Sequence, residues 1–209
     1  MGDAVDALID RLETQATVTS EPAETPDIGI IMGSDSDLDV MSGAHEALDR
    51  LGFAEQTSYQ NPPSERFTYE TYVISAHRTP ELMYAYADTA ADRGLELLIA
   101  GAGGKSADLP NMTASIAYPL PVIGVPVQEK SVDSVIGMPT GAPIVAVDAG
   151  KSFNAALSAV QCLSRAHPEL VESLEDYHDD LRQSVGEVST RLHEKGVAGF
   201  RAAQDQSAH

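Results

Sequence analysis

Cysteine is almost absent from this sequence of 209 residues, which contains only Cys162. A single cysteine cannot form an intrachain disulfide, so the disulfide-rich secreted class is excluded. No apolar run approaches the roughly 18 residues that a membrane span requires. The first 20 residues have neither a cationic start nor an apolar stretch, so a secretory signal is not expected. These absences predict a soluble, cytoplasmic protein.

Lysine is also scarce, and the formal net charge is −19. The four lysines are Lys105, Lys130, Lys151 and Lys195. A chain this acidic repels phosphodiester backbones, so nucleic acid is not an expected partner. The charge favours a solvated acidic shell in a salt-rich, halophile-like cytoplasm, where ions screen self-repulsion. The alternative, an acidic tail that recruits a basic partner, requires a dense local block of charge, and none of the charge runs is dense enough.

The hydrophobic pattern predicts one compact domain with appendages, as the chain length also suggests. Residues 1–26 form an N-terminal appendage, in which a short amphipathic helix precedes a proline-containing linker. Residues 27–165 form the α/β domain that carries the candidate site. Residues 166–209 form a long amphipathic helix, weakened by Gly186, and a tail. The apolar face of the first helix comprises Val5, Leu8, Ile9 and Leu12.

Short aliphatic strands alternate with helices in the α/β domain. The strands are expected at 27–32, 69–75, 95–101, 121–127 and 142–148, and the helices at 38–51, 81–94, 112–117 and 152–163. Strands that are aliphatic throughout are typical of a parallel sheet covered on both faces, so the pattern predicts an α/β fold. Residues 55–67 are expected to form a surface loop.

Several residues receive structural rather than functional interpretations. The alanine-rich helix at 152–163 is expected to be fully buried, with Cys162 as a core thiol. Four histidines share no metal-ligand spacing and are expected to be solvated. They are His45, His167, His178 and His193. No metal site is predicted.

Three loops follow strands and are candidates for a ligand site, because ligands bind beyond the carboxyl ends of parallel strands. The first, GSDSD at 33–37, opens a helix, where free N–H groups and the hydroxyls of Ser34 and Ser36 favour a phosphate. An aspartate facing this ligand would accept from sugar hydroxyls. Alternatively, Ser36 or Asp37 is simply a helix N-cap.

The second loop, SAHRTP at 75–80, places His77 beside Arg78 at the end of a strand. Histidine exchanges protons near neutral pH, and arginine pairs with phosphate. The third loop, AGAGGKSADLP at 100–110, has glycines that allow backbone to approach a ligand, followed by Lys105. A tight strand-to-helix turn would also require such glycines.

The motifs IIMGSDSD, SAHRTP and IAGAGGKSADLPNM, together with GVPVQ and GMPTGAP, identify a resemblance over roughly residues 27–165. The sequence resembles the purine-biosynthetic family of carboxyaminoimidazole ribonucleotide mutases and aminoimidazole ribonucleotide carboxylases. The resemblance implies a flavodoxin-like, three-layer α/β/α fold, a homo-octamer, and neither a metal nor an organic cofactor. It also implies a ribonucleotide substrate, with carbon dioxide as intermediate or substrate.

Motif matching also implies roles for individual residues. His77 corresponds to the acid/base residue, Ser34 and Asp37 to residues that hold the ribose phosphate, and Arg78 to the phosphate partner. The remaining expected substrate-binding residues are Gly33, Ser75, Gly103, Gly104 and Lys105. The mutase reaction moves a carboxylate from the exocyclic nitrogen to the neighbouring ring carbon, by decarboxylation, trapping of carbon dioxide and recarboxylation.

The sequence departs from the mutase pattern after the third loop's glycines. Mutases usually have two small residues and then His-Leu-Pro, whereas this chain has an extra residue and Asp108 in place of the histidine. Lys105 and Ser106 resemble the direct-carboxylase branch, but Arg78 and the AGAGG and GVPVQ motifs favour a mutase. Direct carboxylation is the alternative. A flavodoxin-like binding or receiver module, using Asp35 or Asp37 for a metal or phosphoryl group, is the second alternative.

Overall fold

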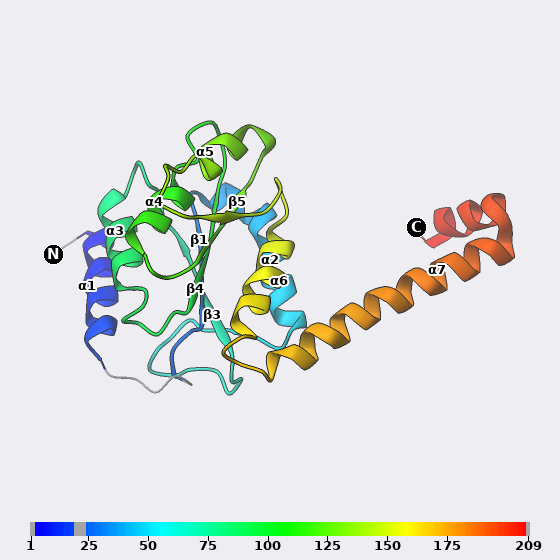
Figure 1. Cartoon of the computed structure of the whole chain (residues 1–209), viewed down its shortest axis with the longest axis horizontal. Coiled ribbons are helices and arrows are strands. Elements are labelled where there is room, and N and C mark those ends of the chain that lie inside the picture. Colours follow the sequence, from blue (N-terminus) through cyan, green and yellow to red (C-terminus); the bar gives the residue numbers. More distant parts are fainter. Residues whose placement is uncertain (1–2, 19–23, 208–209) are drawn as a thin grey trace.

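The computed structural model describes residues 3–18 and 24–207, in which helices cover both faces of a parallel sheet (Figure 1). The six strands lie in the order β2-β3-β1-β4-β5-β6. Their bounds are β1 Ile28–Met32, β2 Ala54–Glu55, β3 Thr68–Val73, β4 Leu97–Ala102, β5 Val122–Pro126 and β6 Val145–Ala146. Apart from the added edge strand β2, this is the flavodoxin-like order, so the predicted fold class is confirmed.

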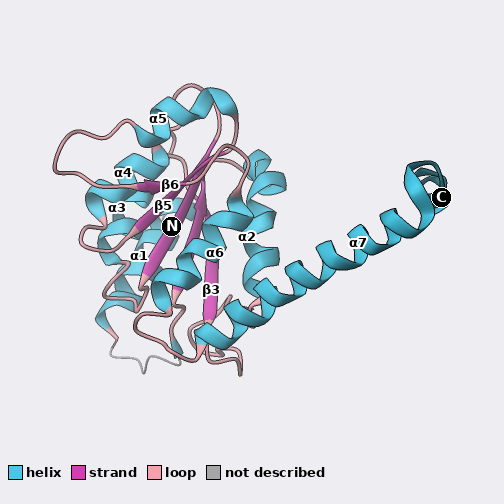
Figure 2. Ribbon diagram, turned by 45° about the vertical axis from the view of Figure 1, so that its right-hand side comes forward, coloured by secondary structure: helices cyan, strands magenta, loops and turns pink. Residues whose placement is uncertain are grey.

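The central strands are buried on both sides because each alternates its aliphatic side chains between two cores. Ile30 of β1 points into the core under α2 (Leu38–Arg50) and α6 (Ser152–Leu163). Its neighbour Ile31 points into the core under α1 (Ala4–Thr17), α3 (Pro80–Thr89) and α4 (Leu109–Ile116). Successive side chains of a strand point to opposite faces of the sheet, and here both sets are apolar. Helices therefore pack on both faces, which gives the three layers seen in Figure 2.

The helix predicted near the N-terminus is present as α1. Asp3 caps it, since its carboxylate accepts from the backbone N–H groups of Val5 and Asp6. Leu12 is fully buried in the core that α1 shares with α3. The predicted linker falls partly on residues 19–23, which lie outside the described residues.

Four secondary-structure predictions were wrong in detail. The loop expected at 55–67 begins within the two-residue strand β2, which pairs with β3. The helix expected to reach Gly94 ends at Thr89, and a turn with Gly94 at φ 95° follows. The loop between the last two strands contains the short helices η3 (Glu129–Ser131) and α5 (Val132–Ile136). The strand expected at 142–148 is only the two-residue β6. Within α7 (Leu170–Ser207), Gly196 has non-helical backbone angles, with φ 64°.

The burial predictions for α6 and two histidines were also wrong. Only one face of α6 is buried in this chain, and Cys162 is exposed rather than a core thiol. His45 is partly buried, and its Nε2 lies 3.0 Å from Thr71 Oγ1. His167 Nε2 lies 2.6 Å from a Glu96 carboxylate oxygen. Tertiary contacts thus partly bury His45 and His167, which the sequence pattern predicted to be solvated.

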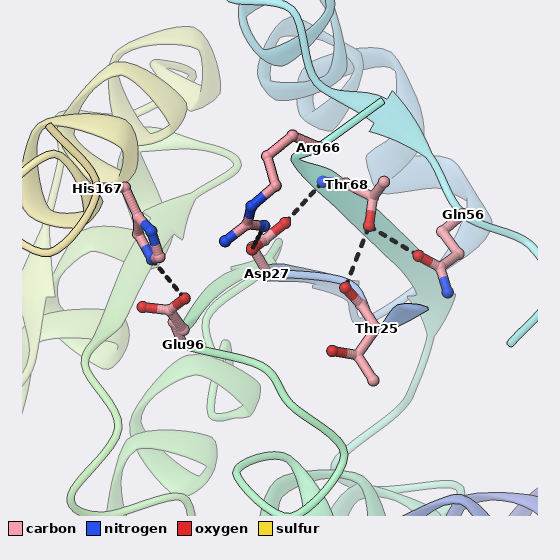
Figure 3. A network of polar contacts seen from close by, with 7 residues as sticks. All are labelled: Thr25, Asp27, Gln56, Arg66, Thr68, Glu96 and His167. Atoms are coloured by element: carbon pink, nitrogen blue, oxygen red, sulfur yellow. Dashed lines mark hydrogen bonds and ion pairs between the residues drawn. The ribbon is translucent and has the colours of Figure 1, made fainter. Parts of the chain in front are cut away.

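A polar network closes the amino edge of the sheet (Figure 3). The Asp27 carboxylate accepts from the backbone N–H of Thr68 at 2.7 Å and pairs with Arg66 Nη1 at 3.3 Å. Thr68 Oγ1 donates to Gln56 Oε1 at 2.8 Å. Burial raises the pKa of Asp27 to about 6, against the opposing effects of Thr68 and Arg66.

Helix α7 extends away from the domain, as both views show (Figures 1 and 2). Its predicted amphipathic pattern leaves Leu181, Val185, Val188 and Leu192 exposed. Among the described residues, no helix has the length and apolar composition needed to cross a membrane.

Candidate active site

The three candidate loops meet at the carboxyl edge of the sheet, where they enclose a cavity of about 350 Å³. Strand β1 lies between β3 and β4, so the loops that follow these three strands emerge side by side. A larger cavity of about 820 Å³ lies between α1 and the edge strands, away from these loops. The smaller cavity is the candidate site because the chemically distinctive residues converge there.

Asp37 lies at the base of this cavity with only 7% of its surface exposed. Burial raises the pKa of Asp37, whereas backbone hydrogen bonds from Ser34 and Gly103 and the charge of Arg78 lower it. A Cβ on Gly103 would lie 3.1 Å from Asp37 Oδ1. Glycine at this position therefore leaves room for the carboxylate to face the cavity.

The helix-cap alternative for Ser36 and Asp37 was wrong, because Ser34 provides the side-chain cap in the first loop. Ser34 is the N-cap of η2 (Asp35–Asp37), and its Oγ accepts from the backbone N–H of Ser36. Asp37 occupies the N-cap position of α2 but makes no side-chain capping bond there. Its carboxylate accepts instead from the backbone N–H groups of Ser34 and Gly103, and it lines the cavity, where its remaining lone pairs face the space for a ligand.

Arg78 connects the first two loops. Its Nη2 donates to the backbone carbonyl of Gly33 at 3.0 Å, and its Nε donates to Ser75 Oγ at 3.2 Å. These bonds orient a guanidinium group that remains exposed at the cavity. An oriented and accessible guanidinium group can pair with a phosphate.

His77 lines the same cavity and contacts the third loop. Its Nε2 is 3.2 Å from Asp108 Oδ2, and the His77 side chain is 60% exposed. Asp108 precedes α4, and its other oxygen accepts from Ser134 Oγ at 2.8 Å. The residue that replaces the expected histidine therefore contacts the candidate acid/base residue directly.

Eight of the nine predicted site residues line the cavity: Gly33, Ser34, Asp37, Ser75, His77, Arg78, Gly103 and Gly104. The ninth, Lys105, is not among the residues that line the cavity, so its predicted place in the site was wrong. Lys130 lines the cavity instead, together with Gln128. Their signal in the sequence was their position in the loop after β5, where Gln128 ends the GVPVQ motif and Lys130 follows two residues later.

A positive φ angle explains why glycine is required at one position of the third loop. Gly104 has φ 86°, a conformation that costs other residues about 1–2 kcal/mol. This turn directs the chain from β4 across the cavity mouth to α4. Within the described residues, no cluster of three or more histidine, cysteine, aspartate or glutamate side chains could hold a metal ion.

Comparison with known proteins agrees with this geometry. The family model for AIR carboxylase matches residues 27–184. The chain belongs to the AIR carboxylase family. An N5-carboxyaminoimidazole ribonucleotide mutase from Pyrococcus horikoshii is 43% identical over 185 residues, covering 86% of this chain and 96% of that protein. The predicted resemblance is therefore confirmed.

Two further relatives show the range of this family. A phosphoribosylaminoimidazole carboxylase from Schizosaccharomyces pombe is 40% identical, but the match covers 87% of this chain and only 31% of that longer protein. The crystal structure of Treponema denticola PurE superposes with a TM-score of 0.64 at 26% identity. That match covers 80% of this chain and 98% of the other, and it supports the α/β assignment.

Proposed function

We propose that this family member converts 5-(carboxyamino)imidazole ribonucleotide to 4-carboxy-5-aminoimidazole ribonucleotide in purine biosynthesis. The observation that carries the proposal is the convergence of His77, Arg78 and Asp37 on one cavity. Their chain is 43% identical to a mutase over nearly the whole of that enzyme. The reaction is an isomerisation and requires no cofactor.

The cavity offers complementary groups for the ribose phosphate. Arg78 pairs with the phosphate, and Ser34 donates a hydroxyl to it. Lys130 adds a second positive charge at the same cavity, in the role first expected for Lys105. Asp37 accepts from ribose hydroxyl groups, since a buried carboxylate beside phosphate would be repulsive. Gly33, Ser75, Gly103 and Gly104 shape the site around these groups.

His77 is the proton shuttle for the carboxylate transfer. When the bond between the exocyclic nitrogen and its carboxylate breaks, the electron pair stays on nitrogen and carbon dioxide is released. His77 supplies the proton that nitrogen takes up. The neighbouring ring carbon then attacks carbon dioxide, and His77 accepts the proton that this carbon loses. The loops around the cavity retain the carbon dioxide between the two steps.

The decisive experiment offers the purified protein two substrates. A mutase turns over the carboxyamino nucleotide, whereas a direct carboxylase turns over the uncarboxylated nucleotide supplied with bicarbonate. Direct carboxylation remains the second candidate because Lys105 and Ser106 follow the glycines and the S. pombe carboxylase is 40% identical. Turnover of neither nucleotide would contradict both enzymes and favour the binding module.

Two variants test the assigned roles. His77→Asn should retain nucleotide binding but lose about a hundred- to ten-thousand-fold in kcat, the usual contribution of general acid–base catalysis. Arg78→Ala should mainly raise Kd for the nucleotide. The exposed Asp39→Asn in α2 serves as a control for altered surface charge. Near-normal turnover by His77→Asn would overturn its assignment, as unchanged affinity in Arg78→Ala would overturn the phosphate site.

Self-association into a homo-octamer is part of the proposal. The exposed apolar residues of α7 and the unburied face of α6 support it, since both would be covered by second copies of the chain. Light scattering at micromolar concentration tests the assembly. A monomeric mass would contradict it. Location in the cytoplasm remains a prediction.

A further inference from the structure

The contact between Asp108 and His77 has features that distinguish it from a surface ion pair. Asp108 is held from the other side, because its Oδ1 accepts from Ser134 Oγ at 2.8 Å while Oδ2 faces His77 Nε2 at 3.2 Å. The carboxylate thus connects the loop after β3, which lines the candidate site, to α5, the helix after β5.

The position of Ser134 is itself fixed. Asn111 of α4 donates from Nδ2 to the backbone carbonyl of Ser134 at 2.8 Å, so α4 and α5 are joined twice. Asp108 occupies the N-cap position of α4 but makes no side-chain capping bond to its own helix. Its carboxylate therefore does not accept from the backbone N–H groups of α4, as an N-cap aspartate usually does, and contacts His77 instead.

We propose that Asp108 is a positioning residue for His77, an inference that rests on the proposed function. The carboxylate accepts a hydrogen bond from Nε2–H, which fixes the ring orientation and its tautomer. Nδ1 then carries the lone pair and is the nitrogen that exchanges the proton with substrate. A carboxylate that orients a histidine in this way also stabilises the imidazolium ion formed when the ring accepts a proton.

Stability alone does not account for this arrangement. The side chains of His77 and Asp108 are 60% and 36% exposed, and exposed ion pairs contribute little to folding. The pair also lies at the cavity rather than on an outer helix face. Removal of the carboxylate should therefore change catalysis more than folding.

The kinetic test compares Asp108→Asn and Asp108→Ala with the unaltered enzyme. Both should lower kcat for the carboxyamino nucleotide about 10- to 100-fold while KM stays within a few-fold, the size of effect seen when a group that orients a metal-binding histidine is removed. Asp108→Glu should restore part of the kcat. Asp133→Asn is the matched control, since this exposed aspartate of α5 carries the same charge near Ser134. Its kcat should be unchanged.

The tautomer can be measured without substrate. Magic-angle-spinning NMR of protein labelled with ¹⁵N-histidine reports which ring nitrogen is protonated, and His77→Asn identifies the signal of His77 among the six histidines. The unaltered protein should show Nε2–H at high pH, and Asp108→Ala should show a mixture of tautomers. Far-UV circular dichroism verifies that each variant is folded.

The outcomes separate the two proposals. Normal kcat in both Asp108 variants, or a His77 tautomer unaffected by Asp108→Ala, would overturn the positioning role while leaving the mutase proposal intact. A tautomer that changes in a protein that turns over neither nucleotide would support the positioning role and contradict the proposed function. A KM effect without a kcat effect would make Asp108 a binding residue and overturn the inference.

Discussion

The buried carboxyl group of Asp27 should make the stability of this protein depend on pH, and Asp27→Asn isolates that dependence. Burial raises the pKa of Asp27 from 3.8 to about 6. Its side chain is only 4% exposed, so solvent screens the effect little. At about 1.4 kcal/mol per pKa unit, the difference corresponds to about 3 kcal/mol of folding free energy.

The sign follows from which state holds the proton. Between pH 3.8 and about 6 the folded protein keeps Asp27 protonated, whereas the unfolded chain releases the proton. The folded state therefore binds more protons, and its stability falls as pH rises through this window. The contribution is fully present below pH about 4 and is lost above pH about 6. Other carboxyl groups titrate in the same range, so only the comparison with a variant isolates Asp27.

Asp27→Asn keeps an oxygen that can accept from the backbone N–H of Thr68 but has no proton to lose. Its stability relative to the unaltered protein should increase by about 3 kcal/mol between pH 4 and pH 7. Because the chain contains no tryptophan, urea unfolding is best followed by far-UV circular dichroism. Protein concentration and ionic strength must be fixed, since self-association shifts apparent stability.

The exposed Asp39→Asn controls for the lost surface charge in the same experiment. A difference between Asp27→Asn and the unaltered protein that stays constant from pH 4 to pH 7 would refute the reasoning. So would a difference that changes in the opposite direction. A constant difference would mean that Thr68 and Arg66 compensate fully for the burial of the carboxylate, and a reversed change would mean that they outweigh it.

Three further predictions concern a buried ion pair, a loop turn and salt. Arg93 Nη1 lies 2.6 Å from Glu70 Oε1, and the Glu70 side chain is 2% exposed. Arg93→Met should destabilise the fold by about 3–5 kcal/mol in urea unfolding, because it leaves the buried Glu70 carboxylate without its cationic partner. Adding Glu70→Leu should recover most of the loss. Gly104→Ala should cost about 1–2 kcal/mol and weaken nucleotide binding in calorimetry, because φ is 86° at this position; unchanged affinity would contradict the placement of this turn. Desalting should loosen the assembly and lower its activity, because screening extends from about 3 Å at 1 M to about 30 Å at 0.01 M salt; a constant mass by light scattering across the series would limit the acidic surface to solubility.

The strands and the three site loops could be predicted because their local pattern agrees with the tertiary structure. Residues 28–32 and 97–102 are aliphatic throughout, and each is buried on both faces of the sheet. The first and third site loops begin where these strands end, and the second follows β3, whose sequence TYETYV is mixed and only partly buried. Because β3, β1 and β4 are neighbours, the sheet itself brings the three loops together. The helix of residues 152–163 was also placed correctly, although its burial was not.

The missed features depend on contacts that are distant in sequence. Strand β2 contains two residues and exists only because β3 pairs with it. Cys162 lies on the face of α6 that nothing in the described chain covers, which alanine-rich composition does not reveal. Asp108 was recognised as a departure from the mutase pattern, but its contact with His77 joins residues 31 positions apart. The pairing becomes visible only in the fold, where the loop after β3 lies beside the loop after β4.

The acidic surface and the candidate site act over different distances. A net charge of −19 opposes the approach of an anionic nucleotide, yet at physiological salt charges more than about 8 Å apart are largely screened. Arg78 and Lys130 line the cavity proposed to hold the phosphate, so their charges would act on it from within the screening length although both residues are exposed. In the proposed function, two of the 13 cationic residues would therefore provide the local attraction, whereas the remaining surface would govern dispersion and assembly. Substituting either cation should change nucleotide affinity far more than adding one at the outer surface.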